Sequence, residues 1–208
     1  MIVLYIVPAI IVFFLAVILI RAALFRPHPE LVPSGEKVEL DEKKIVNDMV
    51  EMIRCKTVSY NDESLIDKEE FRKFQDLLPK LYPKVHEICP REFVGVNGML
   101  YRWKGRAPEE PVVLMAHYDV VPVEEQLWDK PAFEGIIEDG VIWGRGTLDT
   151  KGTFCGIMEA AEKLITEGFV PEHDIYLAFF GTGGDQRTVL SGDCGPVREE
   201  RDTAGSRR

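Results

Sequence analysis

The segment that decides the fold is VVLMAHYD, residues 112–119, in which four apolar residues run directly into a histidine and an aspartate. A short continuous apolar run of this kind predicts a strand that is covered on both faces. Ligands of α/β sheets gather beyond the carboxyl ends of strands, which is where His117 falls. In an extended segment His117 and Asp119 point to the same side. The pair therefore fits a metal-bound imidazole oriented by a carboxylate, and it equally fits a structural hydrogen-bonded pair.

The second segment with chemical interest is GRGTLDTKG, residues 144–152. Three glycines in nine residues predict a tightly bent loop with close backbone approach. Asp149 lies inside this loop, just before a predicted helix, where it could bridge cations or cap the helix N-terminus. A phosphate loop is a poorer fit, because the glycine spacing matches neither the Walker nor the dinucleotide pattern.

The surrounding sequence alternates helical and strand patterns. Apolar periodicity, turn residues and short apolar runs predict helices over 41–54, 67–81 and 153–167, strands over 85–89, 99–103 and 175–180, and a hairpin over 136–143 that turns at Asp139-Gly140. The order of strand, crossover helix and strand from residue 112 to residue 180 predicts an α/β fold with a parallel pair of strands.

The N-terminus differs in kind from the rest of the chain. Residues 1–20 contain no charged side chain, and about 20 apolar residues are enough to span a bilayer as a helix. We expect a single-pass membrane anchor over residues 1–25, followed by a Pro-rich linker over 26–40. A cleaved signal peptide is the main alternative. By the positive-inside rule Arg21 and Arg26 favour a cytoplasmic location for the rest of the chain, but only weakly, so the orientation stays open.

Composition excludes some partners. The formal net charge is −10 at pH 7, which argues against nucleic acid, because phosphate binding needs clustered lysine and arginine. The four cysteines are scattered, and buried or free thiols are expected in place of a disulfide framework.

Together the two segments resemble a known family. VVLMAHYDVVPV (112–123), WDKPAFEG (128–135) and DGVIWGRGTLDTKG (139–152) are similar to the dinuclear zinc exopeptidases and amidohydrolases, which include carboxypeptidase S, the aminoacylases and succinyl-diaminopimelate desuccinylase. The segment RCKTVS (54–59) resembles the start of carboxypeptidase S-like members. The similarity covers about residues 41–181.

The resemblance implies a three-layer αβα catalytic domain with two zinc ions. His117 would ligate one zinc, Asp149 would bridge both, and Asp119 would be the active-site residue that orients His117. Lys151 and Arg145 are interpreted as loop structure. The zinc ions would activate a shared water and polarise an amide carbonyl of a peptide or an N-acyl amino acid.

The pattern breaks after the strand at 175–180. The family continues with an Asp-Glu-Glu run, in which one Glu is the general base and the next a zinc ligand, but here the sequence reads GTGGDQR (181–187). Read one base later, the codons for 183–187 can spell Glu-Glu-Ile-Ser-Gly. We therefore expect residues 41–182 to form the first part of a truncated catalytic domain, and 183–208 to be an aberrant, frameshifted tail.

A chain with half a site is expected to hydrolyse little or nothing. General-base catalysis alone contributes about 10²–10⁴-fold. Two alternatives stay open: a non-catalytic, membrane-anchored binding or relic fragment, and a non-functional product prone to aggregate at an exposed sheet edge.

Overall fold

The computed structural model describes residues 2–26 and 38–181, and it divides the chain into two compact units, residues 1–40 and 41–208. The predicted linker lies mostly outside the described residues, and the predicted aberrant tail lies wholly outside them. Each unit is considered by itself.

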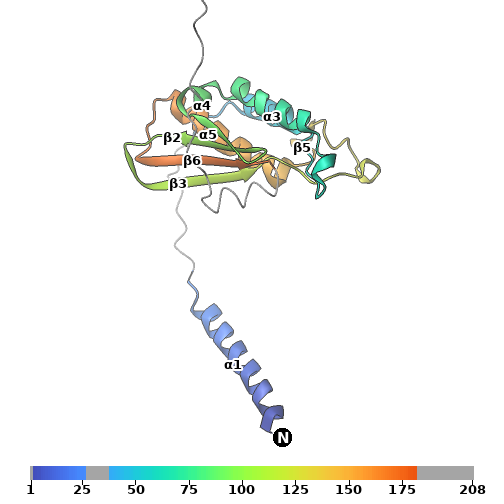
Figure 1. The fold of residues 1–208 in the computed structure, drawn as a ribbon, viewed down its shortest axis with the longest axis vertical. Helices are drawn as coiled ribbons and strands as arrows, with labels where there is room; N and C mark the ends of the chain where they lie inside the picture. Colours follow the sequence, from blue (N-terminus) through green and yellow to red (C-terminus); the bar gives the residue numbers. More distant parts are fainter. Residues whose placement is uncertain (1, 27–37, 182–208) are drawn as a thin grey trace, which may run out of the picture. The chain divides into compact units, whose positions relative to one another are not determined.

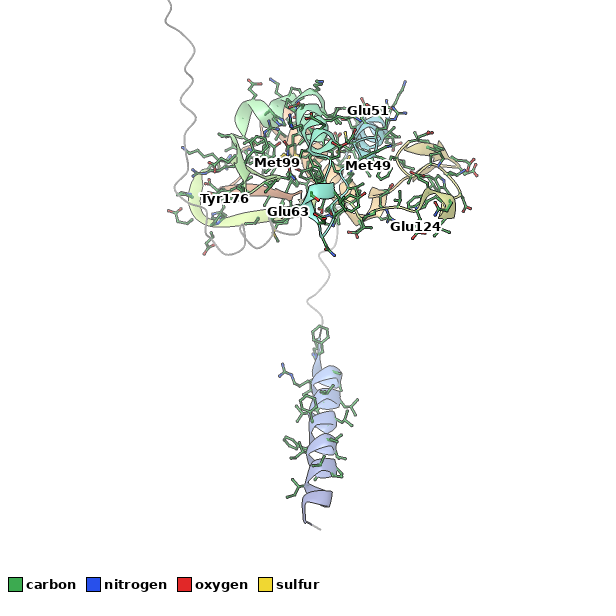
Figure 2. All side chains as sticks on the ribbon, turned by 45° about the vertical axis from the view of Figure 1, so that its right-hand side comes forward. Met49, Glu51, Glu63, Met99, Glu124 and Tyr176 are labelled. Atoms are coloured by element: carbon green, nitrogen blue, oxygen red, sulfur yellow. The ribbon has the colours of Figure 1, made fainter. Side chains whose placement is uncertain are left out.

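The first unit is the helix α1 (Ile2–Leu24). Its segment Ile6–Leu24 has a mean hydropathy of 2.7, and none of it is buried within the structure. Figure 2 shows side chains projecting all around this helix. The predicted apolar helix is confirmed, and it is long and apolar enough to cross a membrane or to serve as a signal sequence.

The second unit is built on a four-stranded mixed sheet (Figure 1). Its order is β1 (Arg91–Val94), β2 (Gly98–Trp103), β6 (His173–Phe180) and β3 (Ala107–His117). β2 is antiparallel to both β1 and β6, whereas β3 is parallel to β6. The helix α5 (Gly152–Thr166) precedes β6 in the crossover from β3. The predicted parallel pair with a crossover helix is therefore confirmed.

Four helices, α2 (Glu42–Ile53), α3 (Lys68–Leu81), α4 (Pro83–Ile88) and α5, contribute to one hydrophobic core. Strands β2 and β6 face this core with alternate residues that are paired in register, among them Met99 with Phe179 and Tyr101 with Leu177. In the described part of the chain the helical layer thus covers one face of the sheet. The fold is mixed α/β, as predicted.

Two local predictions were wrong. Residues 85–89 are not a strand, because Pro83 opens α4 and the carboxylate of Glu162 on α5 caps its N-terminus, accepting from the Lys84 N–H (3.0 Å) and the Val85 N–H (2.8 Å). That cap comes from 77 residues away in sequence, so local pattern could not reveal it.

β3 is not covered on both faces either: its residues 112–115 are 39–50% exposed, because within the described residues β3 is the edge strand.

The remaining elements are small. The predicted hairpin is confirmed as β4 (Ile136–Glu138) and β5 (Val141–Trp143), and both turn residues, Asp139 and Gly140, have positive φ. Short 3-10 turns cover Glu63–Leu65 and Glu125–Leu127. Of the four cysteines, the three in the described ranges are free and buried, as expected; Cys194 lies outside those ranges.

Candidate metal centre

The structure brings all three predicted site residues together. His117 is the last residue of β3, and Asp119 follows two residues later. Asp149 comes from the irregular turn Thr147–Lys151, directly before α5. The backbone at Asp149 is extended, with φ −123° and ψ 91°, and the Asp149–Thr150 peptide bond is cis. No side chain caps the N-terminus of α5 by a hydrogen bond, so Asp149 does not cap this helix; its carboxylate lies instead beside His117 at the end of β3.

The two nitrogens of His117 have different partners. Nδ1 lies 3.0 Å from the backbone oxygen and 3.3 Å from Oδ1 of Asp119. Since both partners are acceptors, Nδ1 carries a hydrogen. Nε2 lies 3.0 Å from Oδ1 of Asp149. With the hydrogen at Nδ1, the contact between Nε2 and the Asp149 carboxylate is satisfied by a further proton or by a metal ion between them.

Electrostatics agree with this arrangement. The hydrogen bond that His117 donates to the Asp119 carboxylate, with smaller contributions from Asp149, raises the pKa of His117 to about 9, although partial burial opposes the rise. The side chain of Asp119 is only 14% exposed, whereas that of Asp149 is 85% exposed. Asp119 is thus positioned to orient the ring from within, and Asp149 to share an external cation with it.

The RCKTVS segment supports the chain around His117. Thr57 is fully buried, and its hydroxyl donates to the backbone oxygen of Tyr118 at 2.5 Å. Val58 and Val120 form a parallel bridge, and the N–H of Val120 donates to the carbonyl of Thr57 at 2.8 Å. This segment therefore pairs with the chain just past His117 through one isolated bridge.

Lys151 links the glycine-rich loop to the C-terminal end of α2. Its side chain is fully buried, and Nζ donates to the carbonyls of Met52 (2.9 Å) and Cys55 (2.8 Å) at the end of α2. Arg145 stacks on Trp128, with its guanidinium carbon 4.9 Å from the ring centroid. Both residues contact protein groups of the scaffold, in agreement with their interpretation as loop structure.

Gly146 fixes the bend of this loop. Its φ of +86° is a left-handed conformation, and an added Cβ would lie 2.6 Å from Cγ1 of Val120. We expect Gly146→Ala to lower the free energy of unfolding by about 2 kcal/mol or more, since the left-handed backbone and the overlap both disfavour alanine. Thermal or urea unfolding measures this effect.

Gly156→Ala is the matched control for that substitution. Gly156 lies in α5, and an added Cβ there meets no atom within 4 Å. Alanine at this helical position should stabilise by about 0.5–1 kcal/mol. Equal destabilisation by the two substitutions would contradict the role of Gly146.

Thr150 is the site residue that sequence reasoning missed. Its hydroxyl contacts the backbone of His117, accepting from the N–H at 3.0 Å and donating to the C=O at 2.8 Å. The available signal was a hydroxyl residue directly after the predicted metal-binding aspartate.

The donors fit part of a metal site. Zinc bonds to imidazole nitrogen and carboxylate oxygen are about 2.0–2.2 Å long, so two ligands of one tetrahedral ion lie about 3.3–3.5 Å apart. The 3.0 Å between His117 Nε2 and Asp149 Oδ1 is a hydrogen-bond distance, and a separation a few tenths of an ångström wider would admit one ion between the two atoms. Residues 2–26 and 38–181 contain no cluster of three or more His, Cys, Asp or Glu side chains able to hold a metal ion. The described residues therefore supply one pair of donors.

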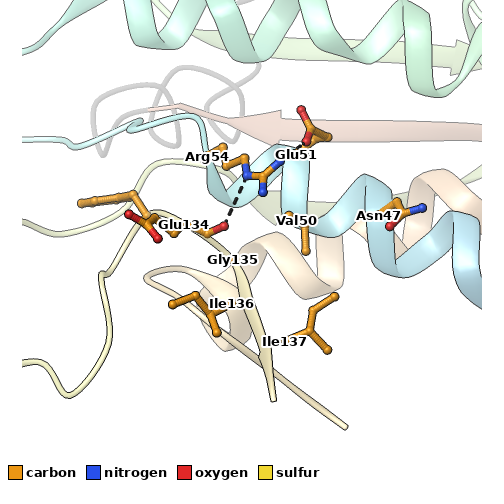
Figure 3. Close-up of a pocket in the computed structure, with 9 residues that line it drawn as sticks. Asn47, Val50, Glu51, Arg54, Glu134, Gly135, Ile136 and Ile137 are labelled. Carbon is orange, nitrogen blue, oxygen red and sulfur yellow. Dashed lines mark hydrogen bonds and ion pairs between the residues drawn. The ribbon is translucent and has the colours of Figure 1, made fainter. Parts of the chain in front are cut away.

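A separate groove of about 620 Å³ lies between α2 and the segment before β4 (Figure 3). It is lined by Asn47, Val50, Glu51, Arg54, Phe133, Glu134, Gly135, Ile136 and Ile137. Arg54 is paired with Glu51 at 2.6 Å and donates to the Glu134 carbonyl at 3.3 Å. His117, Asp119 and Asp149 do not line this groove.

Comparison with known proteins places the site in a family. The family model of peptidase family M20/M25/M40 matches residues 113–182, which include all three site residues. The probable carboxypeptidase S-like 2 of Dictyostelium discoideum is 35% identical over 144 residues, covering 67% of this chain and 28% of that protein. The human N-fatty-acyl-amino acid synthase/hydrolase PM20D1 is 31% identical, covering 66% of this chain and 29% of that protein.

Carboxypeptidase S of Saccharomyces cerevisiae is 36% identical over 116 residues, covering 53% of this chain and 20% of that protein. The chain spans about a third of the length of the first curated relatives it matches, 28–34%.

Solved structures agree on the fold. Human carnosine dipeptidase 1 aligns with a TM-score of 0.60 at 13% identity, covering 73% of this chain and 35% of that chain. The M20 family metallo-carboxypeptidase Sso-CP2 from Sulfolobus solfataricus aligns with a TM-score of 0.54 at 22% identity, covering 68% of this chain and 31% of that chain.

Proposed function

Because this chain contains a segment of peptidase family M20/M25/M40, we propose that its second unit is part of a zinc-dependent hydrolase domain that cleaves amide bonds. Relatives named carboxypeptidase S and N-fatty-acyl-amino acid synthase/hydrolase support peptides or N-acyl amino acids as the substrate class. The observation that carries the proposal is the 3.0 Å approach of Asp149 to His117 Nε2, with Asp119 on the opposite side of the ring.

Each residue has a defined role in this proposal. Nε2 of His117 would hold one zinc ion, and the carboxylate of Asp149 would hold that ion together with a second one. Asp119 holds the Nδ1 hydrogen and so keeps Nε2 free for the metal. Bound zinc would lower the pKa of a water molecule and polarise the scissile carbonyl.

The proposed site is partial. No Glu pair directly follows β6 in the sequence, where GTGGDQR stands at 181–187. We propose that residues 183–208 are translated from a shifted reading frame of DNA that otherwise encodes a longer, three-layer domain. The 208-residue chain would therefore hydrolyse amides slowly or not at all. The nucleotide sequence around the Gly181 codon tests the shifted frame.

Helix α1 is the basis for a proposed cellular location of the chain. We propose that residues 1–20 anchor the chain in a membrane, in keeping with the length and hydropathy of that helix. A non-catalytic, membrane-anchored binding fragment is the second candidate, and the incomplete donor set among the described residues favours it over full activity.

Zinc titration tests the proposal directly. Two zinc ions per chain would indicate a complete site and contradict the impairment; one bound ion supports the partial site; no binding by the folded chain would overturn the metal assignment. Release of amino acid from N-acyl amino acids, measured in parallel, reports whether any hydrolysis remains.

The pH dependence of zinc binding follows from His117. Its pKa is raised to about 9, so zinc has to displace a proton at neutral pH. The apparent affinity should rise about tenfold per pH unit up to pH about 9 and level off above it. Competition with a chelator of known affinity measures this slope, and a flat profile between pH 7 and 9 would contradict the role of His117 as a ligand.

A further inference from the structure

The end of β3 has an unusual hydrogen-bond partner. The N–H of Tyr118 donates to the carbonyl of Phe180 at 2.9 Å, so the backbone groups on this side of β3 bond to β6. In an extended strand the N–H and C=O of successive residues point to opposite sides, which directs those of His117 toward the outer edge of β3, where no strand of the described residues pairs. There the hydroxyl of Thr150 bonds to both, as acceptor at 3.0 Å and as donor at 2.8 Å.

We infer that Thr150 is a positioning residue for the metal site: its hydroxyl takes the place of a neighbouring strand at His117 and sets the spacing between His117 and Asp149. This inference rests on the proposed zinc-binding function. It assigns to Thr150 a contact with the protein backbone and no contact with metal or substrate.

The hydroxyl of Thr150 can restrain both His117 and Asp149 because Thr150 and Asp149 are neighbours in the chain. Thr150 follows Asp149 directly, so the same two hydrogen bonds that hold the His117 backbone also hold the backbone beside Asp149. The carboxylate of Asp149 is 85% exposed, and within the described part of the chain its polar partner is Nε2 of His117. Side-chain packing therefore restrains Asp149 little, and the backbone at 149–150 determines where its carboxylate lies.

The hydrogen bonds of Thr150 differ from those of a hydroxyl that only stabilises the loop. Thr147 lies in the same turn, and its hydroxyl donates to the carbonyl of Gly144 at 2.6 Å. That bond closes the loop on itself and reaches no residue of β3. Loss of the Thr147 hydroxyl should therefore affect stability alone, whereas loss of the Thr150 hydroxyl should change the geometry of the donor pair.

Three variants of the full chain, Thr150→Val, Thr150→Ser and Thr147→Val, separate these roles. Valine keeps the shape of threonine but removes both hydrogen bonds, and serine keeps the hydroxyl. The probe is Co²⁺, whose visible absorption reports ligand geometry. We expect Thr150→Val to bind Co²⁺ about 10–100-fold more weakly, as is typical for loss of a group that supports a ligand, with altered absorption bands. Thr150→Ser and Thr147→Val should keep wild-type affinity and bands.

Two results would overturn the inference: unchanged Co²⁺ binding and bands in Thr150→Val, or an equal loss in Thr150→Ser. If the wild-type chain binds no Co²⁺ at all, the proposed function fails, and the inference is then judged by amide hydrogen exchange in the metal-free chain. Faster exchange at the His117 N–H in Thr150→Val than in Thr147→Val supports the backbone contact; equal exchange in the two variants overturns it.

Discussion

Replacing His117 by alanine should abolish detectable zinc binding, with the affinity falling more than about 100-fold. This exceeds the roughly 10–100-fold that loss of an outer supporting group costs, because the imidazole supplies one of the two donors that converge in the described residues. Removal of the ring also leaves Asp119 without the Nδ1–H that lies 3.3 Å from its carboxylate. Isothermal titration with zinc measures the effect.

His173→Ala is the matched control for this substitution. His173 begins β6, at the opposite end of the strand from Phe180, and its Nδ1 lies 2.6 Å from the Glu109 carbonyl. This half-buried histidine lies outside the donor pair, so the variant should keep wild-type zinc affinity. Equal losses in the two variants would show that zinc binds histidines at the surface without a specific site.

Replacing Lys151 by methionine should lower the free energy of unfolding by about 2–3 kcal/mol. Methionine has nearly the same length, but it leaves the carbonyls of Met52 and Cys55 without the donor that now bonds to both. Urea unfolding measures this loss. Lys163→Met is the control, since Lys163 forms an exposed pair with Glu167 on α5 and should change stability by less than about 0.5 kcal/mol.

A pH series sharpens the Lys151 prediction. Burial lowers the pKa of Lys151 from 10.5 to about 8, so between these values the unfolded chain binds more protons than the folded chain. Wild-type stability measured relative to Lys151→Met should therefore increase as the pH rises from about 8 to 10.5. A difference that stays constant over this window would show that the ammonium is not desolvated.

The sequence predicted those parts of the structure that local pattern controls. Asp41 opens α2 by accepting from the Lys44 N–H, and Gly168 ends α5 with a positive φ, as the capping residues indicate. The resemblance to the zinc exopeptidases implied that His117 and Asp149 share a metal, and the structure brings Nε2 of His117 to 3.0 Å from Oδ1 of Asp149. What sequence pattern could not reveal depends on distant contacts, namely the cap that Glu162 gives to α4 and the edge position of β3.

Thr150 was missed for a related reason. Its residue type is ordinary for a turn before a helix, where a hydroxyl usually bonds to local backbone. The structure instead directs that hydroxyl 33 residues back along the chain, to His117. Only the juxtaposition of the loop and the strand end reveals this contact.

The exposure of residues 112–115 on β3 has a consequence for how the chain can associate. These four residues form an uncharged edge segment. They are preceded by Glu109, Glu110 and Pro111, and charged side chains and proline at an edge disfavour pairing with another strand. At the other end the Thr150 hydroxyl already occupies the hydrogen-bonding groups of His117. A strand that joins this edge, where no strand of the described residues pairs, is therefore confined to a window of about five residues and must stop short of His117.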